Sequence, residues 1–275
     1  MKRRACRTPA LGRDAAPTPA AMQQDLPLET TERTRLPMRT APVAVPAERL
    51  WFCAWLPKLS LEAVPGKVTP AAVVEEQHGV HRILLADAAA TAAGVMPGQA
   101  ANAARALLPE LQLEERSPLH EQQALEGLAS WLERFSSFVS IAGHDVLLLE
   151  IAGSLRLFGG LRELRQGIVR GLDKLGFTVS PAIAPTPLAA TWLARSGRRA
   201  CIRDTSNLAP AIRQLPLACL EWPPGVCSAL AGMGVTTIGD CLRLPREGFT
   251  RRFGARCLLE LDRALGHLPD PRNAW

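Results

Sequence analysis

The chain has 275 residues, which is enough to bury the core of one large domain or two modest ones. Apolar residues make up 47% and charged residues 21%, a composition typical of soluble globular proteins. No apolar run approaches the roughly 20 residues of a membrane span or the core of a signal peptide, so we expect a soluble, cytoplasmic protein. The net charge of +6 suits a nucleic-acid partner but does not require one.

Seven cysteines are scattered along the chain without a Cys-x-x-Cys pair. An odd number without zinc-ligand spacing argues against a disulfide framework and against a structural metal site. We therefore expect reduced thiols and no metal centre of this kind.

Residues 1–47 are rich in Pro, Ala, Thr and Arg and show no sustained periodicity. Because proline removes a backbone donor and breaks helices, this segment is predicted to be a disordered N-terminal tail. A dispensable extension and a tether or non-specific DNA contact are both compatible with it.

Ordered structure is predicted to begin with an apolar strand at 50–55. Two apolar runs around His78-Gly79 predict a hairpin, and the following Ala-rich segment predicts two short helices, broken at Gly94 and at Pro97-Gly98. A longer amphipathic helix is expected at about 118–135.

A second hairpin is predicted with the turn Gly143-His144-Asp145. A helix, a short strand and another helix follow it, with the sequences LRELRQGIVRGLDKLG, TVSPAIA and PLAATWLARSG. From about 215 onward the pattern is helical and punctuated by glycines. This order predicts an α+β fold followed by a small helical domain.

Five segments resemble, in the correct order, motifs of the Y-family (UmuC-type, translesion) DNA polymerases. They are GVMPGQAANAARALLPEL, LERFSSFVS, VLLLEIAGSLRLFGG, FTVSPAIAPTPLAATWLA and GVTTIGDCLRLPREGFTRRFG. None of these motifs is specific alone, but five motifs in this order and at this spacing are together specific for the family. The Trp-rich LWFCAWLPKLSLE and the segment LLLEIAGSLRLFGG are most similar to the ImuB branch of this family.

The resemblance implies a ferredoxin-like palm (48–60 and 115–205), a small fingers insertion (61–114) and a helix-hairpin-helix thumb (206–275). It also implies a role in SOS-induced, error-prone translesion synthesis. The implied partners are damaged or primer-template DNA, ImuA, an error-prone DnaE-type polymerase and the sliding clamp. Because family members continue into a little-finger domain that is absent here, a truncated, non-functional fragment is one alternative.

Family polymerases hold two Mg²⁺ ions with carboxylates from the first palm strand and the central hairpin. The matching positions here are Cys53, Asp145 and Val146, so that Asp145 alone is acidic. A thiol is a poor ligand for Mg²⁺, and valine has no ligand atom. We therefore predict no catalytic residue, no metal and no cofactor, with Asp145 vestigial or a simple turn residue.

The residues that grip the triphosphate in the family are also replaced. Residues 88–91 read Ala-Ala-Ala-Thr where the family has Tyr-Glu-Ala-Arg, and Thr191 stands in place of a lysine. The alternative is an active translesion polymerase that uses Mg²⁺ with carboxylates from elsewhere, such as Glu62 or Asp87.

The thumb segment carries the candidate DNA contacts. One hairpin turn is intact, and its backbone N–H groups are expected to bind phosphate; its candidate residues are Gly234, Thr236, Thr237 and Gly239. Arg252 and Arg256, predicted to share one face of a single helix with Arg251 nearby, are further candidates, although a solvated basic face is the simpler alternative. At the other turn, Glu221-Trp222-Pro223 replaces the expected Gly-Ile-Gly.

Overall fold

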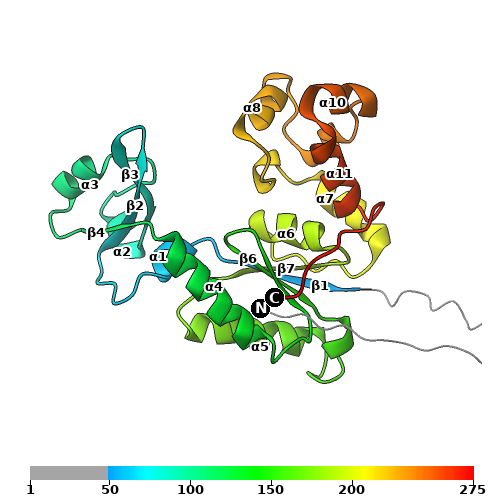
Figure 1. Ribbon diagram of the computed structural model, residues 1–275, viewed down its shortest axis with the longest axis horizontal. Coiled ribbons are helices and arrows are strands. Elements are labelled where there is room, and N and C mark those ends of the chain that lie inside the picture. Colours follow the sequence, from blue (N-terminus) through cyan, green and yellow to red (C-terminus); the bar gives the residue numbers. More distant parts are fainter. Residues whose placement is uncertain (1–48) are drawn as a thin grey trace, which may run out of the picture. The chain divides into compact units, whose positions relative to one another are not determined.

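The computed structural model describes residues 49–275 (Figure 1). The tail predicted at 1–47 lies outside the described residues. Within the described part, the chain forms a four-stranded sheet, a three-stranded sheet and a C-terminal series of helices. None of the helices described is long and apolar enough to cross a membrane.

The four-stranded sheet has the order β5-β6-β1-β7, with all neighbours antiparallel. Its strands are β1 (Trp51–Trp55), β5 (Val139–Ala142), β6 (Val146–Glu150) and β7 (Ser180–Ala184). Helix α4 (Pro118–Leu132) lies between β1 and β5 in the chain, and α5 (Leu161–Lys174) lies between β6 and β7. This β-α-β-β-α-β order with β1 in the interior is the predicted ferredoxin-like arrangement.

Alternate residues of each strand point to opposite faces of the sheet. Both faces are buried because helices cover each of them. Phe52, Leu147 and Leu149 pack with α4 and α5. Cys53 and Leu148 pack on the other face with α6 (Pro187–Arg195). Figure 1 shows α4 and α5 on one side of the sheet and α6 on the other.

The three-stranded sheet has the order β3-β2-β4. The hairpin predicted around His78-Gly79 is confirmed as β2 (Ala71–Gln77) and β3 (Val80–Ala86), and both turn residues adopt positive φ. Strand β4 (Gln112–Glu115), parallel to β2, was not predicted because its sequence is short and mostly polar. The three short helices of this part of the chain are α1 (Leu59–Glu62), α2 (Ala88–Ala92) and α3 (Ala101–Leu107).

Arg116 connects the end of β4 to both neighbouring elements. Its guanidinium donates to Glu75 on β2 at 2.9 Å and, through two nitrogens, to the Glu121 carboxylate on α4 at 2.8 and 2.9 Å. The Glu121 side chain is almost fully buried. This bidentate pair fixes the start of α4 relative to the three-stranded sheet.

The C-terminal helices begin with α7 (Leu208–Arg213) and continue the core that covers the Cys53 face. They are followed by α8 (Pro224–Gly232), α9 (Ile238–Cys241), α10 (Arg246–Phe253) and α11 (Ala255–Ala264). The prediction of one helix carrying Arg251, Arg252 and Arg256 is wrong. Gly254, with φ +88°, ends α10 and places Arg256 on α11.

Candidate functional site

The site lies where the β5–β6 turn meets strand β1 and helix α6. Strands β1 and β6 pair with Cys53 opposite Leu148 and Trp55 opposite Val146. Cys53 and Val146 are both 0% exposed. Burial raises the pKa of the Cys53 thiol to about 12, so the group is an uncharged thiol at neutral pH and a poor ligand or nucleophile.

Asp145 is the last residue of the turn and precedes β6 directly. Its carboxylate accepts a hydrogen bond from the Trp55 indole at 2.8 Å and one from the Arg195 guanidinium, also at 2.8 Å. The Arg195 side chain is only 9% exposed. The one acidic residue expected at the site is therefore held by an indole N–H and a buried cation.

Arg195 forms a second ion pair with Glu221, which precedes α8, at 2.5 Å. Burial alone would lower the pKa of Arg195, but the pairs with Glu221 and Asp145 outweigh it and hold that pKa above its ordinary value. The sequence gives no signal for this arrangement, because Arg195 is 50 residues from Asp145 and 26 residues from Glu221.

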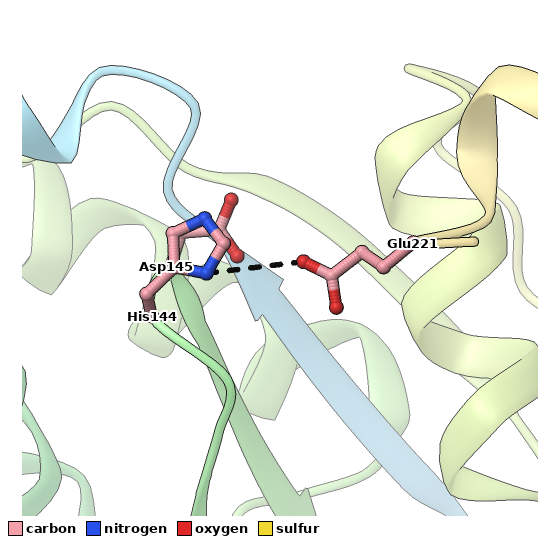
Figure 2. Close-up of side chains that lie close together, drawn as sticks. All are labelled: His144, Asp145 and Glu221. Atoms are coloured by element: carbon pink, nitrogen blue, oxygen red, sulfur yellow. Dashed lines mark ion pairs between the residues drawn. The ribbon is translucent and has the colours of Figure 1, made fainter. Parts of the chain in front are cut away.

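His144 lies beside the same two carboxylates, and Figure 2 shows Glu221 approaching it from the C-terminal region. The His144 Nδ1 atom is 3.9 Å from the Glu221 carboxylate. One ligand atom from each of His144, Asp145 and Glu221 lies within 4.8 Å of the others. A divalent cation bound there would have to compete with Arg195, which already pairs with both carboxylates.

The turn at 234–239, for which DNA contacts are predicted, already holds a carboxylate of the chain itself. Asp240 Oδ2 accepts from the backbone N–H groups of Thr236 and Thr237, at 3.3 and 3.0 Å, and Thr237 caps α9 in return. These are the N–H groups for which phosphate binding is predicted. Bound phosphate would have to displace Asp240 or share the donors with it.

The two glycines of this turn have structural roles. Gly234 follows α8 with φ +77°. Gly239 is buried, and a Cβ on it would lie 2.8 Å from the Arg213 carbonyl oxygen. Close packing of α9 against α7 therefore requires glycine at 239.

The two candidate arginines, Arg252 and Arg256, differ in how accessible their guanidiniums are to a ligand. Arg252 contacts the Met233 sulfur at 3.2 Å and lies over the Phe253 ring. Arg256 forms an i, i+4 ion pair with Glu260 at 3.0 Å. Its side chain is still 86% exposed, so the guanidinium remains accessible to an anion.

Comparison with known proteins finds a family match over a part of the chain that includes Asp145 and Arg195. The impB/mucB/samB family, designated IMS, matches residues 60–195. The chain is 38% identical over 173 residues to the protein ImuB of Caulobacter vibrioides, in two strains, and 28% identical over 196 residues to DNA polymerase IV 2 of Mesorhizobium japonicum.

These alignments cover parts of longer proteins. The ImuB alignment takes in 63% of this chain and 38% of ImuB, and the polymerase IV alignment takes in 70% of this chain and 47% of that protein. The chain thus spans about two fifths of the ImuB proteins that it matches.

The fold is that of the Y-family polymerases. DinB from Sulfolobus solfataricus superposes with a TM-score of 0.62 at 17% identity, covering 82% of this chain and 69% of DinB. The insertion ternary complex of Dbh DNA polymerase gives the same TM-score at 16% identity and the same coverage. The chain therefore shares the fold of these polymerases, and part of it is similar in sequence to ImuB and to the impB/mucB/samB family.

The Y-family fold implies a pair of Mg²⁺ ions, and the residues of this site do not fit them. Mg²⁺ prefers six oxygen ligands in octahedral geometry. The strands offer a buried thiol at Cys53, an isopropyl group at Val146 and an indole at Trp55. Of the positions that match the family's metal ligands, only Asp145 supplies oxygens, and these accept from Trp55 and Arg195.

The carboxylates considered for an active polymerase have other roles. Glu62 accepts from the backbone N–H and the hydroxyl of Thr178, at 2.8 and 2.5 Å. Asp87 caps α2 through the Ala90 N–H and also accepts from the Ala71 N–H. Both groups stabilise loop and helix geometry.

The positions expected to grip a triphosphate carry no cation. Residues 88–91 form most of α2, and Ala90 is fully buried there. The Thr191 hydroxyl donates to the Pro187 carbonyl within α6, and the side chain lies next to the Cys53 thiol. Neither position can pair with phosphate charge.

Proposed function

We propose that this protein is a non-catalytic, Y-family polymerase-like DNA repair protein that acts as an adaptor in SOS-induced, error-prone translesion synthesis. One observation supports the loss of catalysis: Cys53 and Val146, which match the family's magnesium-binding positions by motif resemblance, are both fully buried and non-acidic. Two-metal catalysis needs several oxygen ligands around each ion. A buried thiol and an isopropyl group cannot replace them.

DNA is the first proposed partner. A net charge of +6 favours association with phosphate, and the relatives by fold are DNA polymerases by name. We assign the contacts to the turn residues Gly234, Thr236, Thr237 and Gly239 and to Arg252 and Arg256. The exposed Arg256 is the freest of these side chains.

The other proposed partners are ImuA, an error-prone DnaE-type polymerase and the sliding clamp, all in the cytoplasm. Their support is the 38% identity to ImuB over 173 residues. An adaptor without its own chemistry needs to hold DNA and a working polymerase at once. The aligned region corresponds to 38% of ImuB, so partner contacts outside that region are to be sought in the longer homologues.

Two alternatives differ from this proposal in what they require. An active translesion polymerase needs a metal site, and the structural roles of Glu62 and Asp87 weigh against the ligands considered for it. A truncated, non-functional fragment would neither bind DNA nor retain a partner.

Binding of primer-template DNA, with and without the correct nucleotide, tests the proposal. Fluorescence anisotropy should show DNA binding that is unchanged by a complementary deoxynucleoside triphosphate with Mg²⁺. An active polymerase would bind the primer-template more tightly in the presence of the correct nucleotide than of an incorrect one. A pull-down of purified ImuA and the DnaE-type polymerase then tests the adaptor role, and retention of neither would contradict it.

A further inference from the structure

A groove lies between α5 and the edge strand β7, on the face of the four-stranded sheet opposite to the one that carries the Cys53 side chain. Its volume is about 590 Å³. Along α5 it extends from Leu161 to Arg170, which is about 14 Å at the helical rise of ~1.5 Å per residue. None of the site residues discussed above lines it.

Four arginines surround this groove: Arg162, Arg165, Arg170 and Arg199. No acidic residue is among the residues that line it. Within the described part of the chain, none of the four arginines forms an ion pair or a side-chain hydrogen bond. Among the residues that the structure describes, no acidic side chain pairs with these four positive charges, whereas Arg195, Arg116 and Arg246 are all paired.

Five apolar residues also line the groove, and we call them its apolar base: Leu161, Val169, Val179, Pro181 and Ile183. Pro181 and Ile183 are themselves buried. Val169 and Val179 are only partly buried, although they pack against the core that α4 and α5 share with the sheet. A ligand that gains from this surface must bring apolar groups as well as negative charge.

The edge of β7 is closed to strand addition at this point. Ile183 already pairs through both its N–H and its carbonyl with residues 200 and 202. Pro181 has no N–H to donate, and proline on an edge strand prevents pairing with another chain. Recognition here must therefore depend on side chains.

We propose that this groove is a docking site for an acidic segment of a partner protein in which Asp or Glu alternates with apolar residues. Four unpaired guanidiniums complement the carboxylates, and the apolar base receives the side chains between them. Duplex DNA bound along its backbone would satisfy the arginines but leave the apolar base uncovered, because its bases are stacked inside and it offers only phosphates and sugars; single-stranded nucleic acid is distinguished by the test below. The proposal is independent of whether the chain has polymerase activity.

A synthetic 12-residue peptide of alternating Glu and Leu, labelled with fluorescein, tests this in the full chain by anisotropy. Saturable binding is expected. The double variant R165E/R170E should weaken it at least tenfold, because both guanidiniums become repulsive carboxylates. The matched control is K67E/R105E, which makes the same charge change at two exposed residues away from the groove, and it should leave binding within about twofold.

Two further probes separate the apolar contribution from simple charge. Poly-glutamate of equal charge and a single-stranded oligonucleotide of equal charge should bind at least fivefold more weakly than the Glu-Leu peptide. V179T, which keeps the side-chain shape but replaces a methyl group by a hydroxyl, should weaken binding of the peptide and leave binding of the oligonucleotide unchanged.

The proposal would be overturned in favour of a nucleic-acid surface if the oligonucleotide bound as tightly as the peptide or more tightly, and if R165E/R170E abolished that binding. Peptide binding that K67E/R105E reduces as much as R165E/R170E does would overturn it as non-specific. Absence of saturable binding by the peptide would also overturn it. Circular dichroism of each variant shows whether the fold is retained. If R165E/R170E fails to fold, V179T still tests the groove, because it changes no charge.

Discussion

The Arg195 guanidinium lies 2.8 Å from the Asp145 carboxylate and places a fixed positive charge beside the one acidic residue at the candidate site. Glu221 joins the same guanidinium from the C-terminal region, so one cation neutralises two carboxylates. In a polymerase, metal ions would supply positive charge near this point. Here a side chain of the protein supplies it, which removes much of the electrostatic reason for a metal to bind.

Restoring one carboxylate should therefore destabilise the protein. In Cys53→Asp the new carboxylate has no exposed surface, and the nearby Arg195 already pairs with Asp145 and Glu221, so we expect a loss of roughly 3 kcal/mol or more at neutral pH. Chemical denaturation measures it, with Cys53→Ala as the control for lost volume. If the double variant C53D/V146E were instead stabilised by millimolar Mg²⁺, the metal geometry would be intact and our account of the site would be wrong.

The pair of Arg116 with buried Glu121 predicts a pH-dependent contribution to stability. Burial alone raises the pKa of Glu121, but hydrogen bonds from Arg116 outweigh it and hold that pKa below its ordinary value of 4.5. The pair therefore stabilises the fold above pH 4.5 and loses its effect as the pH falls through the lower, folded-state pKa.

Arg116→Met should cost roughly 3 kcal/mol at pH 7, because it leaves the Glu121 carboxylate buried without a partner. The difference from wild type should shrink as the pH is lowered through 4.5. Urea denaturation at pH 7, 5 and 4 provides the comparison, and Arg105→Met, at an exposed residue, is the control. A difference that stayed constant over this range would rule out the ionised pair as its source.

Gly171 is required where α5 crosses α4. A Cβ at this position would lie 2.0 Å from the Trp131 ring, so Gly171→Ala should destabilise the protein by about 1–3 kcal/mol. Gly127, on the exposed side of α4, has no atom within 4 Å of its added Cβ, and Gly127→Ala should be neutral or stabilise by up to about 1 kcal/mol. Thermal unfolding of both variants checks the pair, and similar losses in the two would contradict the packing argument.

The elements predicted from the sequence are those with local signals. Both hairpins were found because apolar runs flank a short turn, and the positive φ of His78 and Gly79 shows why that turn forms. Strand β4 was missed because its partner, β2, lies about 40 residues earlier in the chain. Arg116, at the end of β4, bonds to Glu75 on β2. The break at Gly254 was missed because glycine alone does not say whether a helix is interrupted or continues.

From the sequence, the candidate site could be predicted only as a set of missing metal-binding and phosphate-binding side chains. Alignment with family motifs shows that Cys53 and Val146 are not acidic, and their complete burial agrees with that interpretation. The replacement charge could not be predicted, since nothing in the spacing of Arg195 relates it to Asp145 or Glu221. The Asp240 contacts with Thr236 and Thr237 were equally hidden, because Asp240 could have pointed to solvent.

The thumb assignments predict a characteristic salt dependence of DNA binding. Arg256→Ala should weaken binding to all sequences alike and lower the slope of log affinity against log salt by about 1 if it contacts one phosphate. Asp240→Asn should strengthen binding, because it removes a negative charge from the N–H groups assigned to phosphate. Arg105→Ala serves as the control, and an unchanged slope in Arg256→Ala would exclude that contact.

Template-directed primer extension by the purified chain, with Mg²⁺ and with Mn²⁺, tests the central claim most directly. We expect no incorporation above background with either ion. We also expect Asp145→Ala to behave as wild type, because Asp145 is paired with Arg195 and holds no metal. Template-dependent incorporation by the wild-type chain that disappears in Asp145→Ala would contradict the account.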